Sequence, residues 1–285
     1  MLVAKPAGPT SHDVVDIVRR VLGVQRVGHL GTLDPFAKGL LVLVVGRATR
    51  LAAFAAGWTK SYEGVIRLGI TTDTDDATGV SIATAPWTGI TLEQLASVIG
   101  EFRGAYEQRP PAYSAVKIDG ERAYKRARRG ETVAPAARRV EIHELEIVEA
   151  AVPDLRFRAT VSGGTYLRSV ARDIGAALGC GGHLAALRRT AVGRLQLADA
   201  VLPEAVTPAD VRDPAVLVQD LARRNLTDDE REAVVHGRPI AVGPLTPSPE
   251  PQAPGPVALF AGGQLLAVAD HVGEFLKPRV VVAEA

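Results

Sequence analysis

Residues 28–46 read GHLGTLDPFAKGLLVLVVG, and this stretch most constrains how the chain can fold. A turn-rich segment leads directly into an apolar run, Leu40–Val45, which predicts a fully buried strand. One carboxylate, Asp34, stands with Pro35 at the entrance to that strand. An Asp-Pro pair can simply form a turn, or the carboxylate can be partly desolvated and aimed into a site by the backbone.

The length of 285 residues allows a sizeable buried core and predicts two domains. Apolar residues make up 47% of the chain, yet the longest apolar run is too short to cross a bilayer. The N-terminus lacks the apolar core and the cleavage site of a signal peptide. We therefore expect a soluble, cytoplasmic protein that does not enter a membrane.

Motifs for metals and cofactors are missing from the sequence. Cys180 is the single cysteine, and although His183 lies close to it, no second ligand pair exists to hold zinc. Neither a GxxxxGK[ST] loop nor a strand-linked GxGxxG occurs. We therefore expect no metal and no cofactor.

The charged residues are balanced overall but unevenly distributed. The net charge is +1, while residues 117–139 hold eight Lys and Arg against three acids. Residues 156–194 hold seven Arg against one Asp. Two such stretches suit a protein that holds a polyanion on one face, although they are also compatible with solvated surfaces.

Periodicity and capping signals predict an α+β chain. Ser11 is the expected N-cap of a first helix that Gly23 ends, and a Thr91–Gln94 capping box begins another. Apolar and polar residues alternate over 154–161, which predicts a strand with one apolar face. The other expected elements are helices over 47–56, between Gly120 and Gly130 and after Gly163-Gly164, strands over 61–68 and 138–150, and a helix or strand over 183–190.

The composition changes after about residue 210. A short helix closed by Gly237 is followed by a Pro-rich stretch, 243–256, that we expect not to pack. The last thirty residues contain three short β segments. These features predict a small β-rich terminal domain, and we place the two domains at residues 1–222 and 223–285.

Two further residues are candidates for a site. Tyr62 opens an expected strand, where it could stack on a ring or be an ordinary strand aromatic. Arg168 stands near the start of a helix, where the helix dipole does not favour a cation. A specific anionic partner for Arg168 is therefore expected.

The loop with Asp34 resembles the catalytic motif of the TruB family of tRNA pseudouridine synthases. Further blocks follow in that family's order over most of residues 5–194: KPAGPTSHDVV, KSYEGVIRLG, TTDTDDATG, QRPPAYSAVKIDGERAYKRARRG, GGTYLRSVARDIG and GGHLAALRRTAVG. The resemblance implies a mixed, mainly antiparallel sheet of pseudouridine-synthase type. It also implies a PUA-like RNA-binding module at residues 223–285.

The resemblance implies the isomerisation of uridine-55 in the T loop of tRNA to pseudouridine. The reaction needs no redox step and no cofactor, and the nucleotide must be flipped into a pocket to be reached. Asp34 matches the family's essential aspartate. Three roles are open for it: attack at C1′, attack at C6, or removal of a sugar proton.

Other positions match the family one at a time. Tyr62 matches the tyrosine that stacks on the flipped base, and Arg168 matches the arginine that orients the catalytic carboxylate. Asp76 matches an acid that braces this arginine, or it could cap a turn; Asp75 is adjacent, so the choice of Asp76 rests on spacing. The remaining matches are Leu187 on the floor of the uracil pocket (or plain core), His29 near the vacated position in the T loop, Tyr166 lining the pocket, and Lys5 in a structural role.

Three functions are compatible with these features. The preferred one is a stand-alone, monomeric synthase that binds the T arm of tRNA through its basic stretch, including Arg126, Arg128 and Arg129. The alternatives are a tRNA-folding chaperone and the catalytic subunit of a guide-RNA particle. Asp34, Tyr62 and Arg168 together argue against binding alone.

Overall fold

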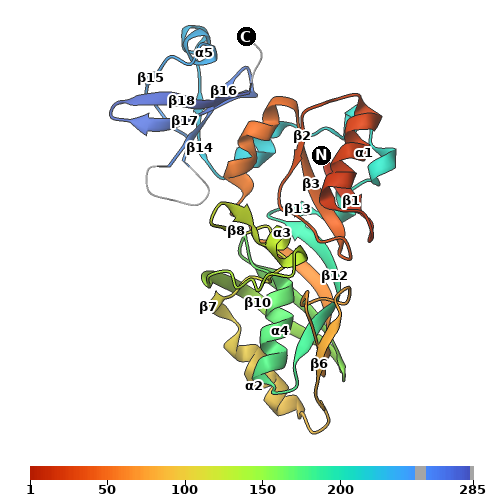
Figure 1. Cartoon of the computed structure of the whole chain (residues 1–285). Coiled ribbons are helices and arrows are strands. Elements are labelled where there is room, and N and C mark those ends of the chain that lie inside the picture. The colour runs from red at the N-terminus through yellow and green to blue at the C-terminus, as the bar shows by residue number, and fades with distance from the viewer. Residues whose placement is uncertain (248–254, 283–285) are drawn as a thin grey trace.

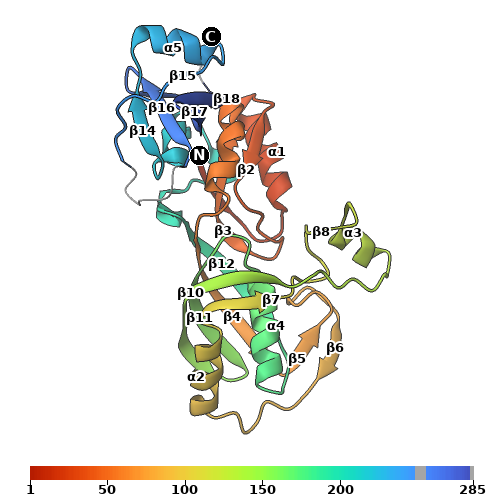
Figure 2. The ribbon, with the colours of Figure 1, turned by 90° about the vertical axis from the view of Figure 1, so that its left-hand side faces the viewer.

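The computed structural model describes residues 1–247 and 255–282 and contains two main sheets (Figure 1). A nine-stranded sheet forms the body of the molecule, and a five-stranded sheet lies at the end opposite α2 (Figures 1 and 2). The expected mixed α+β fold with mainly antiparallel pairing is confirmed. Within the described ranges, no helix is long and apolar enough to span a bilayer.

The nine-stranded sheet has the order β1-β3-β12-β4-β11-β10-β7, with β2 beside β3 and β13 beside β12. Its pairings are antiparallel except that of β3 with β12. There Gly39 lies opposite Arg189, and a Cβ on Gly39 would collide with the Arg189 carbonyl oxygen. The strands are β1 (Leu2–Lys5), β2 (Val27–His29), β3 (Lys38–Val45), β4 (Lys60–Leu68), β7 (Gly104–Gln108), β10 (Arg138–Ala151), β11 (Asp154–Val161), β12 (Gly182–Val192) and β13 (Leu195–Gln196).

Helices and short hairpins connect and flank the strands of the two sheets. The hairpins are β5 (Ile70–Thr72) with β6 (Ser81–Thr84), and β8 (Lys117–Ile118) with β9 (Glu121–Arg122). Figure 2 shows β8 and α3 projecting from the body. The α-helices are α1 (Ser11–Leu22), α2 (Leu92–Glu101), α3 (Ala123–Arg128), α4 (Leu167–Ala177) and α5 (Asp228–Val235). The 3-10 helices are η1 (Gly46–Ala55), η2 (Leu197–Asp199), η3 (Pro203–Ala205), η4 (Pro208–Asp210) and η5 (Pro214–Val218).

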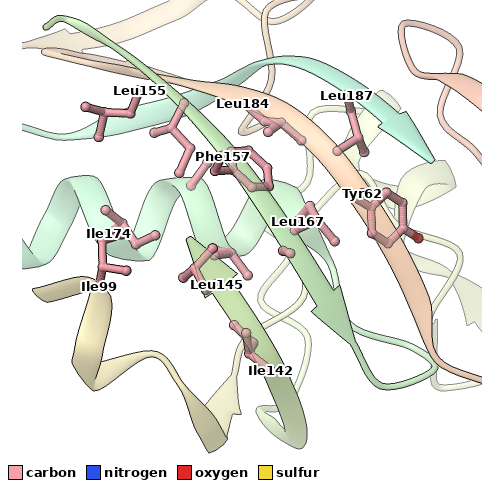
Figure 3. Close-up of a cluster of buried hydrophobic side chains, with 14 of the residues drawn as sticks. Tyr62, Ile99, Ile142, Leu145, Leu155, Phe157, Leu167, Ile174, Leu184 and Leu187 are labelled. Carbon is pink, nitrogen blue, oxygen red and sulfur yellow. The ribbon is translucent and has the colours of Figure 1, made fainter. Parts of the chain in front are cut away.

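The main core lies between the nine-stranded sheet and the helices α4 and α2 (Figure 3). The apolar face of β11, which the alternation over 154–161 predicts, is buried there. Burial of such faces supplies most of the driving force for folding. The side chains in this core that Figure 3 labels are Tyr62, Ile99, Ile142, Leu145, Leu155, Phe157, Leu167, Ile174, Leu184 and Leu187.

The five-stranded sheet has the order β14-β16-β17-β18-β15 and carries α5. A shared apolar cluster connects it to the body, since Ala258, Phe260 and Leu265 pack with Leu51 and Leu217. The β-rich end of the chain is thus confirmed, while its PUA-like character and the boundary at residue 222 stay predictions. Its strands are β14 (Ala222–Asn225), β15 (Ile240–Ala241), β16 (Val257–Ala261), β17 (Gln264–Val272) and β18 (Phe275–Val281).

Two expectations of local structure need correction, and a third is confirmed with its helix type now specified. Thr10, not Ser11, caps α1: its hydroxyl accepts a hydrogen bond from the Asp13 backbone N–H, and the Asp13 carboxylate accepts one from the Thr10 N–H. The helix expected over 47–56 is the 3-10 helix η1. The Pro-rich stretch 243–256 lies partly outside the described residues, but Leu245 packs on the terminal core, and Thr246 exchanges backbone hydrogen bonds with Arg223. The expectation that this stretch does not pack is therefore wrong at its start.

Candidate active site

The loop that carries Asp34 joins β2 to β3, and hydrogen bonds from Lys5 hold its backbone. The Lys5 ammonium donates hydrogen bonds to the carbonyl oxygens of Pro6, Pro35 and Ala37, at 2.9, 3.2 and 2.7 Å. Burial lowers the pKa of Lys5 to about 8, and the negative charge of Asp34 partly opposes this shift. These contacts hold the backbone of the loop at Pro35 and Ala37, just after Asp34.

Two residues that the sequence analysis did not single out for this role also fix the loop. The Ser11 hydroxyl donates to the Leu33 carbonyl oxygen at 2.9 Å and accepts from the Leu33 N–H at 2.8 Å. Arg189 is almost completely buried and donates to the carbonyl oxygens of Leu40 and Gly31, at 2.7 and 3.0 Å. A buried arginine bonded to carbonyl groups is uncommon. Here it stabilises the backbone on both sides of the aspartate.

Asp34 and Arg168 form a two-point ion pair. Arg168 Nε lies 2.9 Å from Asp34 Oδ2, and Nη2 donates to Oδ1 at 3.1 Å. The Arg168 side chain is 5% exposed, whereas that of Asp34 is 33% exposed, so one side of the carboxylate stays open to solvent. The planar fork of the guanidinium fixes the orientation of the carboxylate. Arg168 thus has the anionic partner that its position near the start of α4 led us to expect.

The Arg168 guanidinium is itself fixed by the surrounding loops. Nη1 donates to the Thr74 carbonyl oxygen and Nη2 to that of Tyr113, both at 2.9 Å. Nη1 also lies 3.5 Å from a carboxylate oxygen of Asp76, whose other oxygen accepts hydrogen bonds from the hydroxyls of Thr74 and Thr78. Of the two adjacent aspartates, Asp76 is therefore the one that braces Arg168.

The surroundings of Asp34 both raise and lower the pKa of its carboxyl group. Burial raises the pKa of the Asp34 carboxyl, and the nearby charge of Asp76 raises it further. Arg168 and Lys5 oppose the rise. Desolvation wins this balance, so the carboxylate is more basic than an ordinary aspartate. A perturbed carboxylate at the mouth of a site is the expected state of a catalytic group.

The apolar cluster of the main core includes residues of the loop that carries Asp34. Tyr62 on β4 and Leu187 on β12 belong to the main core together with Leu33 and Ala37, which lie on either side of Asp34 in the loop. Figure 3 shows Tyr62 and Leu187 at the same end of the cluster, with the Tyr62 hydroxyl pointing outward. A ring, a branched aliphatic side chain and a carboxylate together suit a flat, partly polar ligand.

His29 and Tyr166 lie on elements that border this region. His29 ends β2, and burial, aided by the positive charge of Arg189, lowers its pKa. Its buried Nδ1 has no hydrogen-bond partner within the described part of the chain. Tyr166 precedes α4, exchanges hydrogen bonds with Gln108 through its backbone, and has the Arg138 guanidinium 4.8 Å from its ring centre.

The three basic candidates lie on α3 and just after it, in the part of the chain that projects from the body (Figure 2). Arg126 pairs with Glu131 at 2.8 Å, and Arg129 pairs with Glu121 and Glu131, both at 2.7 Å. These arginines lower the pKa of Glu131. Arg128 makes no ion pair with any described residue. Of the three, Arg128 is therefore the cation most available to an external phosphate.

The arrangement can perform acid–base or nucleophilic chemistry on a base or sugar. A partly open carboxylate is held by a guanidinium, on a loop whose apolar residues share the buried cluster of Tyr62 and Leu187. Within the described ranges, no three His, Cys, Asp or Glu side chains form a group that could hold a metal ion.

Solved structures share this architecture. The chain aligns over 99% of its length with a crystal structure of a Cbf5–Nop10–Gar1 complex, at a TM-score of 0.76 and 24% identity, covering 84% of that chain. A structure of an H/ACA ribonucleoprotein bound to a substrate RNA containing 2′-deoxyuridine gives a TM-score of 0.74 at 22% identity, covering 99% of this chain and 85% of that one. These likenesses show that the fold is that of pseudouridine synthases.

Sequence comparison gives the family. Residues 19–167 match the TruB family pseudouridylate synthase N-terminal domain, and residues 168–227 match the tRNA pseudouridylate synthase B C-terminal domain. Proteins called tRNA pseudouridine synthase B are similar over most of the chain. The one from Mycobacterium sp. strain KMS is 47% identical over 85% of this chain and 84% of its own length. The one from Thermobifida fusca strain YX is 45% identical over 99% of this chain and 98% of its own length. The chain belongs to the TruB family of pseudouridylate synthases and is an enzyme of that isomerase class.

Proposed function

We propose that the chain isomerises uridine-55 in the T loop of tRNA to pseudouridine, with Asp34 as the essential catalytic group. The proposal is carried by the ion pair of Asp34 with Arg168, because it holds a partly exposed carboxylate of raised pKa in a fixed orientation. Membership of the TruB family supports the reaction class, and the names of the relatives support tRNA as the substrate.

The reaction breaks the N1–C1′ bond, turns the uracil and joins C5 to C1′. The proton on C5 is lost and N1 gains one, so the product is an isomer and no oxidant or reductant takes part. We propose that the base stacks on Tyr62 over Leu187 after the nucleotide has flipped out of the T loop. In this proposal, the Asp34 carboxylate then reaches the sugar or the base.

We propose further that the enzyme acts alone, as a monomer. The solved structures that share its fold contain partner proteins. Because they are less than 25% identical to this chain, they support only the fold and not the same partners. The relatives that are 45–47% identical are called tRNA pseudouridine synthase B. The β-rich terminal sheet would then add contacts to the RNA backbone, which strengthen binding without taking part in the chemical step.

The test is an assay with the purified chain and an unmodified T-arm stem-loop that carries tritium at C5 of uridine-55. Release of tritium by the purified chain alone, with no partner protein added, supports both the reaction and its independence from partners. A stem-loop labelled at uridine-54 instead is the matched control, and it should release none. Tritium release from the control at an equal rate, or from neither RNA, would contradict the proposal.

A further inference from the structure

Helix α4 carries two arginines one turn apart, Arg168 and Arg172, which share one face of the helix. Arg168 contacts Asp34 and Asp76, as described above. Arg172 makes a parallel set of contacts one turn further along, starting with Asp75. The proposed chemistry gives Arg172 no role, since its nearest carboxylate is not Asp34.

All three nitrogens of the Arg172 guanidinium are engaged. Nη1 donates to Asp75 Oδ2 at 2.9 Å, and Nε donates to Asp173 Oδ1 at 2.8 Å. Nη2 donates to the carbonyl oxygen of Arg109, also at 2.9 Å. The side chain is 25% exposed, so these contacts are partly shielded from water. Arg172 thus connects α4 with the loop after β5 and with the segment after β7.

The segment 109–113 links the two arginines through the backbone carbonyls at its two ends. Its first carbonyl, that of Arg109, accepts hydrogen bonds from Arg172 and from the fully buried Ser169, both at 2.9 Å. Its last carbonyl, that of Tyr113, accepts from Arg168. Two consecutive prolines at 110–111 restrict the φ angles of two of the residues between these points. A displacement at Arg109 would therefore reach the group that holds Arg168.

The loop after β5 makes a second connection. Asp75 has a φ of +61°, a left-handed conformation that is unfavourable for a residue other than glycine. Its backbone carbonyl accepts a hydrogen bond from the Leu184 N–H, and its carboxylate reaches Arg172. With this backbone, Asp75 faces Arg172 while the adjacent Asp76 faces Arg168. The Asp75–Arg172 pair therefore helps to hold Asp76 and the Thr74 carbonyl against Arg168.

We propose that Arg172 is a positioning residue for the isomerisation. By holding the Asp75 carboxylate and the Arg109 carbonyl, it fixes both segments that position Arg168, and through Arg168 it fixes the orientation of Asp34. The inference rests on the catalytic role proposed for Asp34. A displacement of about 1 Å in a positioning group can lower a rate by about a hundredfold, so a defect here should be measurable.

The first test is the Arg172→Lys variant, which keeps the positive charge but lacks the planar fork that serves three acceptors. We expect the single-turnover rate on saturating T-arm stem-loop to fall by about tenfold or more, with RNA affinity and melting temperature close to those of the unchanged protein. The matched control is Arg67→Lys, which disrupts the two-point pair between Arg67 and Asp154, at 2.7 Å, that joins β4 to β11 away from the site. It should leave the rate unchanged.

The pH dependence separates positioning from a general loss of stability. The charged groups that face Asp34 are Arg168 on α4, Asp76 in the loop after β5 and Lys5 on β1. Because Arg168 lowers the pKa of Asp34, a loosened Arg168 should shift the acid limb of the rate profile to higher pH. Arg172→Lys and Asp75→Asn should both show this shift, which a role confined to folding would not produce.

A measurement without substrate keeps the inference separate from the proposed function. The carboxyl carbon of Asp34, followed by ¹³C NMR, should titrate at higher pH in Arg172→Lys than in the unchanged protein, whether or not the stem-loop is a substrate. If Arg172→Lys does not fold, Ser169→Ala, which removes the other donor to the Arg109 carbonyl, carries the same expectations. A folded variant with an unchanged rate and an unchanged Asp34 titration would overturn the proposal.

Discussion

Asp34 is held by an arginine yet remains more basic than an ordinary aspartate. Lys5, Ser11 and Arg189 hold the backbone of its loop, and Arg168 holds its side chain. At the scale of single residues, the site is thus built mainly from cations and hydroxyls that bind backbone carbonyls. Such contacts restrict the loop, so the carboxylate needs little reorganisation before it reacts.

The raised pKa of Asp34 predicts the acid limb of the rate profile. A carboxyl must be ionised to act as a nucleophile or a base, and a raised pKa means that it becomes protonated at a higher pH than usual. The single-turnover rate should therefore begin to fall at a pH above the ordinary aspartate pKa of about 3.9. An acid limb at or below that value, measured on RNA shown to remain intact, would contradict the burial argument.

Tyr62 allows its ring and its hydroxyl to be tested separately. Tyr62→Phe keeps the ring and should lower the single-turnover rate by about a hundredfold if the hydroxyl transfers a proton. Tyr62→Leu removes the ring as well, and the loss of base stacking should cost a further 1–3 kcal/mol or so of interaction with the flipped base. A Phe variant with full activity would show that stacking is the whole contribution of this residue.

Candidate residues for the site can be chosen from the sequence, but the contacts that support them cannot. Asp34, Arg168 and Asp76 were identified from motif positions, and the structure brings all three together. Arg172 and Arg189 were not singled out, because an arginine in a sequence carries no sign that its partners are backbone carbonyls of distant loops. Their roles depend on tertiary placement, which no local pattern encodes.

The same contrast holds for secondary-structure elements. The Thr91–Gln94 box and the alternation over 154–161 predicted α2 and β11 correctly. The stretch HLAALRRT could not be assigned, because its residues form helices well, and it is the strand β12 only because it pairs with β3 and β4. At the start of α1, Thr10 and Ser11 are both suitable N-cap residues. Thr10 is the N-cap because Asp13 lies three residues after it and forms a capping box with it.

The arginines on and just after the basic helix α3 are expected to differ in their contribution to RNA binding. Arg126 and Arg129 are paired with Glu121 and Glu131, whereas Arg128 is free of ion pairs among the described residues. Arg128→Gln should therefore weaken RNA binding and reduce the slope of log affinity against log salt by roughly 0.7–0.9. The rate at saturating RNA should stay the same. An unchanged slope would mean that this helix is a solvated surface.

At the scale of the whole molecule, the terminal sheet and the body share one apolar cluster. Phe260 of β16 packs in this cluster and is 7% exposed, with the Arg223 guanidinium 3.8 Å from its ring centre. The terminal sheet therefore contributes to folding as well as to the RNA binding that we propose for it.

Phe260→Ala tests this contribution. It should lower the free energy of unfolding by about 3–5 kcal/mol, because it opens a cavity in a shared core, without lowering the rate at saturating RNA. The matched control is Phe275→Ala, since Phe275 is 52% exposed and its loss should change stability by about 0.5 kcal/mol or less. Equal effects of the two variants would show that the shared cluster does not stabilise the fold.

The most direct test of the account compares the unchanged protein with Asp34→Asn on a T-arm stem-loop at saturating RNA. The variant keeps the shape of the side chain but removes its charge. We predict that RNA affinity and melting temperature stay close to those of the unchanged protein, while the single-turnover rate of tritium release falls by about a thousandfold or more. A rate within about tenfold of the unchanged enzyme would contradict the assignment of Asp34 as the catalytic group, because loss of an essential nucleophile or base costs far more than that.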